Sequence, residues 1–334
     1  MTSLAIGLVY DLLGSQPRRP GAPPDVDAEY EPEATVEALE AAVRHAGHRP
    51  LRVGSPHDLL ARLGKGELPL LDAAWNIAEG YGARNREAWA PVLLEMAGVP
   101  TLGSDALTLS ASLDKAWTRT LVASAGVPVP AGALAGSAAE AEKLQIPAGF
   151  PWFVKPRWEG TAKGIRASSR VADRAALVRE VERIAGDYGQ PALIEAFLPG
   201  AEYTVTLIGN DPPRALPVLQ RALEADTRIG LHALERHTPR EGWRHVLPGG
   251  LDPALEAELA RLSRLAWGAL GCRDFARADF RLDANGCPLF LEINPLPTFT
   301  PDGSFGILAE LEGRSLEALL GDVLVAGLRR LGRT

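Results

Sequence analysis

The sequence has few cysteines, no basic excess and no long apolar run, and each absence excludes a class of protein. Its 334 residues include two cysteines, Cys272 and Cys287, too few for a disulfide framework and without the paired spacing of a zinc site. We interpret both as small core side chains and expect a reduced, cytoplasmic compartment. The formal net charge of -7 provides no basic field for a nucleic-acid backbone, so nucleic acid is not an expected partner.

No apolar stretch approaches the ~20 residues that a membrane-spanning helix needs, so we expect no membrane partner. The apolar run at 4–10 is short, lacks a basic leader and meets Asp11 at once. It therefore predicts a buried strand rather than a signal peptide. No G-x-G-x-x-G sequence follows this strand, which disfavours a dinucleotide-binding dehydrogenase.

Lysine is also scarce, because arginine supplies most of the 35 basic residues. The five lysines are Lys65, Lys115, Lys143, Lys155 and Lys163. A lysine is a compact point charge that suits a phosphate oxygen, so some of these positions are candidates for phosphate binding. The alternative is that the five positions arose by chance in an arginine-biased sequence.

The first third of the chain alternates short apolar strands with helical segments, which predicts a parallel sheet with helices on its faces. The pattern changes near residues 113 and 200, so we predict domains at 1–112, 113–200 and 201–334. Strands are expected at 4–10, 50–53, 73–77, 152–154, 192–198 and 202–208, and helices at 33–46, 87–96, 115–125, 173–185 and 253–270. The stretch 16–27, rich in proline, glycine and arginine, is interpreted as an exposed loop.

Two alternating segments near the C-terminus flank an Asn-Gly pair at 285–286, the preferred pair for a two-residue type I′ hairpin loop. Such a loop would place Asp279 opposite Glu292 and Arg277 opposite Asn294. All four side chains would then share one face of the hairpin. The opposite face would carry the apolar residues Ala278, Phe280, Leu282, Leu291 and Ile293.

Two carboxylates that face each other across a strand pair repel unless a cation lies between them. Carboxylate and amide oxygens suit a hard cation such as Mg²⁺, which also binds substrate phosphates. The hairpin therefore predicts a Mg²⁺ or Mn²⁺ site formed by Asp279, Glu292 and Asn294. The alternative is that Arg277 or Arg281 neutralises the acids and the arrangement is purely structural.

Residues 153–165 predict a strand, a glycine-rich loop and a second strand. Gly160 and Gly164 would let the backbone approach a phosphate closely, and Thr161 offers a hydroxyl and an amide. The loop lacks the G-x-x-x-x-G-K order of a Walker motif, and an ordinary turn is the alternative.

The strand expected at 192–198 could present backbone groups to an adenine edge, and the carboxylate of Glu202 could bind ribose hydroxyls. The alternative for both Glu195 and Glu202 is a solvated charge at the end of a strand. Neither residue identifies a nucleotide site when taken singly.

Taken together, these segments resemble the ATP-grasp fold and, within it, the D-alanine:D-alanine ligase family. The resemblance covers almost the whole chain. It is carried by Lys115, Lys155-Pro156, Glu195 to Leu198, Glu202, Arg277 to Asp279 and Leu291 to Pro295, and for the ligase group by 76–80, 98–104 and 270–275. It implies an α/β, three-domain ATP-grasp fold in which a parallel-sheet N-terminal domain accompanies two α+β subdomains that clasp ATP.

The resemblance implies an ATP- and Mg²⁺-dependent carboxylate-amine ligase that forms a D-alanyl-D-alanine-type dipeptide for peptidoglycan through an acyl phosphate. The residues that would bind ATP are Lys115 and Lys155 at the phosphates, Glu195, Ala196 and Leu198 at adenine, and Glu202 at the ribose. The family's two magnesium ions would bind to the three hairpin residues named above.

Four further residues resemble parts of the family's catalytic site. Arg277 would stabilise the oxyanion of the tetrahedral intermediate, and Glu31 would hold the ammonium group of the first amino acid. Ser304 would receive the carboxylate of the second amino acid. Thr161 stands where the family has the first of two serines in its glycine-rich loop.

The sequence departs from the family pattern at three places. The serine pair is replaced by Thr161-Ala162, and the Pro-Gly turn after the metal-binding asparagine is replaced by Pro297-Thr298. The family's lysine over the phosphates has its nearest match at Arg236, next to His237. These departures bear on the amino acid substrates more than on the nucleotide.

The expected partners are small amino acids, and a homodimer is a further possibility. Two alternatives remain open. One is a related ligase for a different pair of amino or hydroxy acids, and the other is a nucleotide-binding regulatory protein without catalysis.

Overall fold

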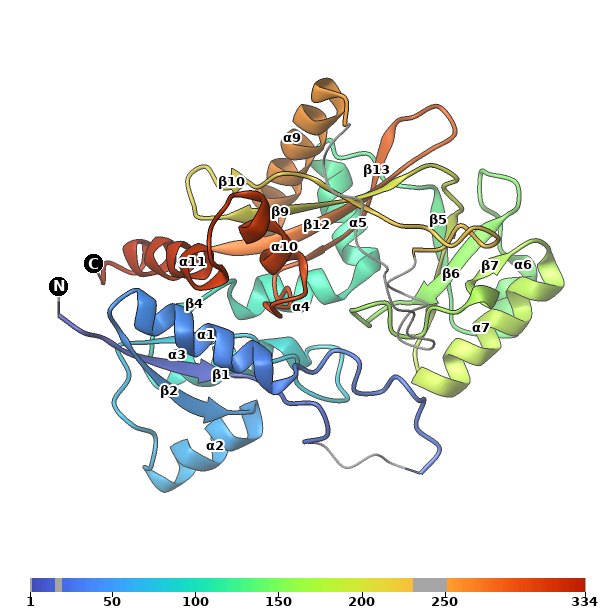
Figure 1. Cartoon of the computed structure of the whole chain (residues 1–334). Helices are drawn as coiled ribbons and strands as arrows, with labels where there is room; N and C mark the ends of the chain where they lie inside the picture. The colour runs from blue at the N-terminus through green and yellow to red at the C-terminus, as the bar shows by residue number, and fades with distance from the viewer. Residues whose placement is uncertain (1, 16–19, 231–250, 334) are drawn as a thin grey trace.

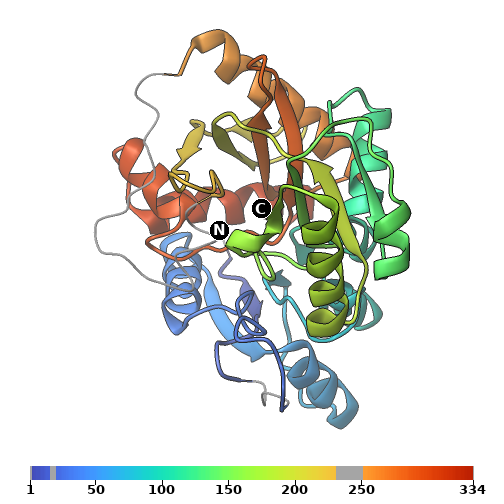
Figure 2. The same cartoon turned by 90° about the vertical axis from the view of Figure 1, so that its right-hand side faces the viewer.

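The computed structural model describes residues 2–15, 20–230 and 251–333, which form three β-sheets with helices packed against them (Figure 1). In Figure 1 the N-terminal sheet lies below, the central sheet to the right, and the C-terminal sheet above. The two termini lie near each other in both views, at the left of Figure 1 and near the centre of Figure 2. Each sheet falls within one of the three predicted domains, whose boundaries remain a prediction.

The N-terminal sheet is parallel, with the strand order β2-β1-β3-β4. Its strands are β1 (Ala5–Val9), β2 (Arg49–Gly54), β3 (Ala73–Asn76) and β4 (Thr101–Leu102). Its helices are α1 (Glu33–His45), α2 (Pro56–Lys65), η1 (Arg86–Ala88), α3 (Trp89–Met96) and α4 (Ala106–Leu113). One core cluster joins the sheet to α1 and a second joins it to α2 and α3, so the prediction of helices on its faces is confirmed.

The central sheet is antiparallel, with the order β5-β8-β6-β7. Its strands are β5 (Gly132–Ala135), β6 (Trp152–Pro156), β7 (Arg170–Val171) and β8 (Ala192–Ala196). Its helices are α6 (Ala138–Lys143), η2 (Ala167–Ser169) and α7 (Arg174–Tyr188). Helix α5 (Lys115–Ser124) precedes β5 in the chain and packs against the C-terminal sheet. The prediction of a strand directly after the glycine-rich loop is wrong, because the chain stays irregular to residue 166 and β7 begins only at Arg170.

The C-terminal sheet is also antiparallel, with the order β10-β9-β12-β13 and with β11 paired to β9. Its strands are β9 (Glu202–Ile208), β10 (Arg214–Ala215), β11 (Leu219–Arg221), β12 (Phe275–Leu282) and β13 (Pro288–Asn294). Helix α9 (Pro253–Leu270) packs on its apolar face together with α5, which leaves the other face to polar side chains.

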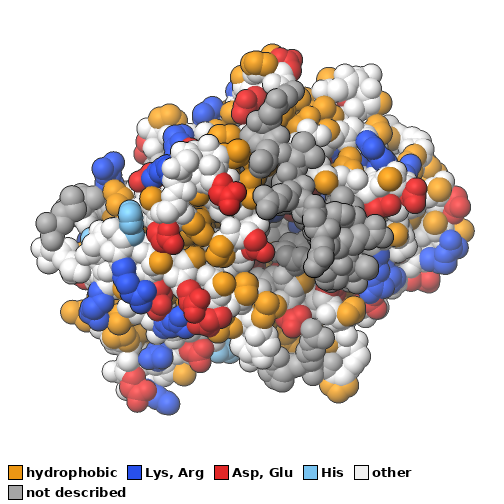
Figure 3. All heavy atoms as spheres, in the orientation of Figure 1, with side chains coloured by type: hydrophobic (Ala, Val, Ile, Leu, Met, Phe, Trp, Pro, Cys, Tyr) orange, Lys and Arg blue, Asp and Glu red, His pale blue; other side chains and the backbone are white. Residues whose placement is uncertain are grey.

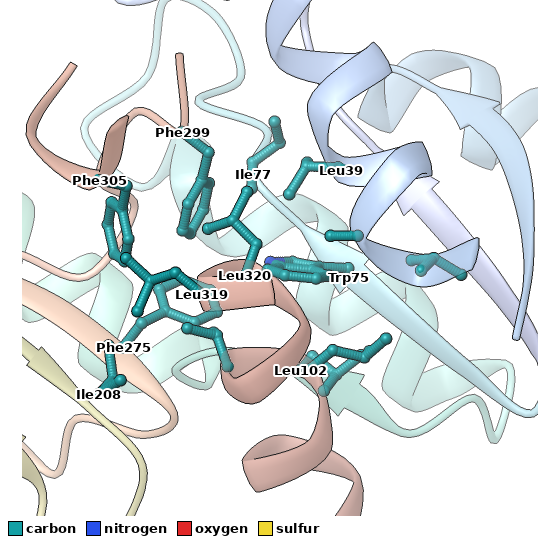
Figure 4. Close-up of a cluster of buried hydrophobic side chains, with 14 of the residues drawn as sticks. Leu39, Trp75, Ile77, Leu102, Ile208, Phe275, Phe299, Phe305, Leu319 and Leu320 are labelled. Carbon is teal, nitrogen blue, oxygen red and sulfur yellow. The ribbon is translucent and has the colours of Figure 1, made fainter. Parts of the chain in front are cut away.

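The last two helices connect the C-terminal sheet with the N-terminal one. Helix α11 (Leu316–Arg330) packs against α1, and α10 (Ser304–Leu311) packs against α11. Figure 4 shows the shared core, where Trp75 of β3, Phe275 of β12 and Leu320 of α11 lie together. The rings of Trp75 and Phe275 are 6.1 Å apart, so the two sheets are held by a common apolar cluster.

Two interpretations of the sequence need correction. Cys272 is buried as expected, but Cys287 is exposed because it lies beside the hairpin loop rather than in a core. The stretch 16–27 is not uniformly exposed, since Asp25 is buried against the central domain. Among the residues that the structure describes, no helix is long and apolar enough to cross a membrane. Basic and acidic side chains are interspersed on the face drawn in Figure 3.

Candidate active site

The polar face of the C-terminal sheet brings the predicted metal-binding and catalytic side chains together. Asp279 lies directly opposite Glu292, and Arg277 lies directly opposite Asn294. Residues that are directly opposite in an antiparallel pair point to the same face of the sheet. The predicted pairing of these four residues is therefore confirmed.

The hairpin reaches this pairing by a different route from the predicted one. The backbone N–H of Asp283 donates to the carbonyl of Cys287 at 2.9 Å, which closes a three-residue loop instead of a two-residue one. Phe280 is consequently paired with Phe290, and a bulge at Leu291 restores the register before the acidic pair. Phe290 takes the core position predicted for Leu291, whose side chain lines the neighbouring cleft.

Basic side chains contact both hairpin acids. Arg277 donates to Asp279 from Nε at 3.2 Å and from Nη2 at 3.1 Å, while Lys115 Nζ lies 2.8 Å from Glu292 Oε2. Burial opposes ionisation of Glu292, but the charges of Lys115 and Lys155 lower its pKa to about 2. Arg277 therefore neutralises Asp279, as the purely structural alternative predicted. Arg281 pairs instead with Glu202, with 3.5 Å between Nη1 and Oε2.

The donor set fits a hard divalent cation. Two carboxylates and an amide share one face, and oxygen is the ligand atom that Mg²⁺ prefers. Asn294 Oδ1 is oriented by the N–H of Leu296 at 2.9 Å. In the part of the chain that the structure describes, no group of three or more Asp, Glu, His or Cys side chains forms a metal cluster. A cation here would rely on phosphate oxygens for its remaining ligands.

A cleft between the central and C-terminal sheets contains the residues predicted to bind ATP. They are Lys115, Lys155, Glu195, Ala196, Leu198 and Glu202, which line the cleft together with Asp279 and Glu292. Lys155 Nζ lies 2.8 Å from Glu195 Oε2, and both side chains are buried. The other oxygen, Glu195 Oε1, lies 3.2 Å from Arg119 Nε, so this buried carboxylate is held between two cations.

A second cavity of about 720 Å³ lies between the N-terminal domain and the polar face of the C-terminal sheet. The predicted site residues that line it are Glu31, Thr161, Arg277, Glu292, Asn294 and Ser304. Glu292 lines both this substrate cavity and the nucleotide cleft. A group transferred from one space to the other would therefore pass beside its carboxylate.

Glu31 is held by two hydroxyl groups inside the substrate cavity. Its Oε2 accepts hydrogen bonds from Thr35 Oγ1 at 2.8 Å and from Thr298 Oγ1 at 2.9 Å. Thr298 is one of the residues at which the sequence departs from the family pattern. The departure therefore acts directly on the acid that is predicted to hold the first amino acid.

The glycine-rich loop is attached to the N-terminal domain by two acids that the sequence did not predict. The N–H of Gly160 donates to Glu29 Oε1 at 2.5 Å, and the N–H of Gly164 donates to Asp25 Oδ2 at 2.8 Å. Arg86 pairs with Glu29 at 2.7 Å. Burial opposes ionisation of Glu29, but Arg86 and Lys163 lower its pKa to about 2.

Thr161 and Ala162 lie in this attached loop with φ angles of 49° and 56°. This left-handed conformation is unusual for residues other than glycine. Both side chains line the substrate cavity, so the loop presents them to its contents. Nothing in the spacing of the sequence indicated that residues 25 and 29 hold the loop, because the contacts join segments more than 130 residues apart.

A pair of buried acids lies beside the same cavity. Burial raises the pKa of Glu79 well above its ordinary value, and the charge of Glu87 adds to this. Burial also raises the pKa of Glu87 to about 7, although Arg86 opposes the shift. These two acids therefore hold a proton more readily than ordinary glutamates. Arg236, the nearest match to the family's lysine over the phosphates, and the adjacent His237 lie outside the described residues.

The comparisons with known proteins agree with this geometry. A family model described as "D-ala D-ala ligase C-terminus" matches residues 121–325. An "uncharacterized protein" of Sinorhizobium fredii is 32% identical over 311 residues, covering 88% of each chain. The D-alanine–D-alanine ligase of Alcanivorax borkumensis is 31% identical over 302 residues, covering 89% of this chain and 91% of the relative.

Solved structures share the fold at lower identity. The D-alanine–D-alanine ligase of Bacillus anthracis complexed with ATP has a TM-score of 0.72 at 19% identity, covering 98% of both chains. The VanG D-Ala:D-Ser ligase of Enterococcus faecalis has a TM-score of 0.73 at 17% identity, covering 98% of this chain and 100% of the other. The predicted α/β ATP-grasp fold is confirmed by this likeness.

Proposed function

The chain belongs to the D-alanine–D-alanine ligase family, and from this membership we propose that it is an ATP-dependent ligase that joins two D-alanine-type amino acids. The product would be a dipeptide of the kind used in peptidoglycan synthesis. The observation that carries the proposal is the position of Glu292 between the nucleotide cleft and the substrate cavity. A phosphoryl group leaving ATP would meet a carboxylate substrate at this point.

The first step makes the carboxylate reactive. An oxygen of the first amino acid's carboxylate attacks the γ-phosphorus, the bond to the bridging oxygen breaks, and ADP leaves. Lys115 and Lys155 would hold the phosphate oxygens, since both are buried cations in the nucleotide cleft. Glu31 would orient the ammonium group of the same amino acid, because its carboxylate lines the substrate cavity.

The second step forms the peptide bond. The amine of the second amino acid attacks the acyl carbon, gives up a proton, and displaces inorganic phosphate. Arg277 would stabilise the oxyanion of the tetrahedral intermediate, and Ser304 would bind the carboxylate of the second amino acid. Thr161 would lie over the transferred phosphoryl group from the glycine-rich loop.

We propose Mg²⁺ or Mn²⁺ as the metal, held by Asp279, Glu292 and Asn294. The metal would supply charge neutralisation at the phosphate oxygens. Arg277 and Lys115, which now pair with the two acids, would be free to contact phosphate or substrate oxygens. We also propose a cytoplasmic location, where ATP is available, and a homodimer through the apolar side chains exposed on α5, Trp117 and Leu121.

The proposed function is tested by phosphate release with ATP, Mg²⁺ and each of D-alanine, L-alanine and D-lactate, followed by mass measurement of the product. D-Alanine is expected to give ADP, phosphate and a product with the mass of the dipeptide. If none of the acids causes phosphate release but ATP stabilises the fold, the protein is instead a nucleotide-binding regulatory protein.

A ligase for a different pair of amino or hydroxy acids is the second candidate. It is favoured by Thr298, whose hydroxyl contacts Glu31, and by Thr161-Ala162, which face the substrate cavity. Turnover with D-lactate or another acid but not with D-alanine alone would favour this candidate. The acyl-phosphate chemistry would be the same in both cases.

A further inference from the structure

Arg221 lies in the substrate cavity, and neither the sequence patterns nor the proposed reaction gives it a role. It is the last residue of β11 and pairs in register with Glu202 of β9. Its side chain therefore lies on the polar face that carries Asp279 and Arg277. It is only 6% exposed, which is unusual for an arginine unless the charge has a function or a close partner.

One hydrogen bond orients the guanidinium group of Arg221, and no acid pairs directly with its charge among the described residues. Its Nε donates to Thr204 Oγ1 at 2.6 Å, and that hydroxyl donates to Asp279 Oδ1 at 2.8 Å. Among the described residues, the guanidinium group makes no ion pair within contact distance and no second hydrogen bond. The residue lines the cavity, and neither of its Nη groups has a hydrogen bond among the described residues.

Arg277 opens onto the same space. Its Nε and Nη2 donate to Asp279, which leaves Nη1 without a hydrogen bond among the residues that the structure describes. Burial lowers the pKa of Arg221, the charge of Asp279 raises it, and the positive charge of Arg277 lowers it because the two cations repel each other. An anion between them would relieve this repulsion and accept their remaining N–H groups.

We propose that Arg221 is an oxyanion-binding residue that acts with Arg277 to hold a carboxylate or phosphoryl oxygen in the substrate cavity. The proposal rests on the proposed function, since it assigns a further contact within the same reaction. A guanidinium group suits this task because its planar N–H groups match the oxygens of carboxylate and phosphate. Two sources share that chemistry: the carboxylate of the second amino acid and the phosphoryl group during transfer.

Kinetics of the Arg221→Met variant separate the two sources. Met keeps much of the side-chain volume and removes the charge. A rise of about 10- to 100-fold in the KM for the second amino acid, with kcat unchanged, identifies the carboxylate. A fall of the same size in kcat, with that KM unchanged, identifies the phosphoryl group. Arg221→Lys should restore part of the loss in either case, because it returns the charge but not the planar geometry.

Arg214→Met is the matched control. Arg214 lies in β10 of the same sheet, is exposed, and lines neither cavity. Kinetic constants of Arg221→Met that stay within 2-fold of the wild type would overturn the proposal. A lower Tm with unchanged kinetics would also overturn it, because that result describes a purely structural arginine.

Calorimetry keeps the proposal testable if no acid supports turnover and the proposed function fails. The dissociation constants of inorganic phosphate and of D-alanine would be measured in the presence of ADP and Mg²⁺. Arg221→Met should weaken the binding of one of these two ligands by about 10-fold, while Arg214→Met should not. Equal affinities of wild type and Arg221→Met for both ligands would contradict the proposal.

Discussion

The nucleotide cleft and the substrate cavity meet at Glu292 but differ in how they are built. In the cleft, Glu292 pairs with Lys115, and Glu195 pairs with both Lys155 and Arg119. In the cavity, the acid Glu31 is held by two hydroxyl groups, and Arg221 has no ion pair among the described residues. The cleft therefore holds its cations in ion pairs, whereas the cavity contains a cation whose charge is not paired directly.

Glu292→Gln should have the largest effect, because it changes the residue that both spaces share. We expect kcat to fall by about 100-fold or more, since the substitution removes a charge at the proposed point of phosphoryl transfer with little change of volume. Phosphate release measures the loss, and thermal unfolding checks the fold. Glu310→Gln, at an exposed site of α10, is the control. Unchanged turnover would mean that the two spaces do not exchange a phosphoryl group at Glu292.

Lys155→Met tests the nucleotide cleft without changing the substrate cavity. The buried ammonium group of Lys155 is expected to contact a phosphate, so the KM for ATP should rise by about 10- to 100-fold. The KM for the amino acids should stay within 2-fold. The control is Lys143→Met on the exposed end of α6. A change in amino acid KM of the same size would show that the two spaces are not independent.

Thr298→Val tests the substrate side with a smaller expected effect. The substitution keeps the branched shape and removes the hydroxyl that orients Glu31. We expect the KM for the first amino acid to rise by about 3- to 10-fold, which corresponds to one hydrogen bond. The KM for ATP should not change. Thr120→Val, at an exposed position of α5, provides the comparison, and an effect confined to ATP would refute the assignment of Thr298 to the substrate side.

Glu87→Gln should alter the pH dependence of stability rather than the chemistry. The folded protein keeps a proton on Glu87 up to about pH 7, whereas the unfolded chain loses it near the ordinary value of 4.5. The stabilisation from that proton is complete below about pH 4.5 and is lost as the pH rises through 7. The wild type should thus lose stability from pH 5 to 8, and the variant should lose less.

Thermal unfolding at pH 5 and pH 8 measures this difference. We expect the Tm of Glu87→Gln to exceed that of the wild type by about 2 °C at pH 8 and to differ little at pH 5. Glu95→Gln, on the exposed side of α3, should leave the pH dependence unchanged. A Glu87→Gln variant with the wild-type pH dependence would show that the folded protein does not retain this proton.

The sequence predicted the long elements and the face-to-face acids because these follow from local periodicity. Helices such as α1 and α9 lie within a residue of their predicted bounds. The start of β7 was missed, since a short strand paired through only two residues has little periodicity of its own. The roles of the site residues remain predictions, although the structure gathers the described ones around two adjoining spaces.

Contacts between distant segments could not be predicted from the sequence. The attachment of the glycine-rich loop by Asp25 and Glu29 depends on how the N-terminal domain docks, not on any local pattern. Arg221 ends a three-residue strand, and only its pairing with β9 reveals that it faces the acids. These residues depend on tertiary arrangement, and they lie in or beside the cavity where substrate choice would be determined.

The bulge at Leu291 has a consequence for how the hairpin tolerates change in length. Because it shifts the register back by one residue, two consecutive side chains, Leu291 and Glu292, face the cleft, one apolar and one charged. A deletion in β13 between Cys287 and Glu292 would leave the acids paired only if the bulge also disappeared. A change of length in one strand therefore has to be matched by a compensating change in the bulge or in the other strand. Loss of the bulge alone would place Asp279 opposite Leu291.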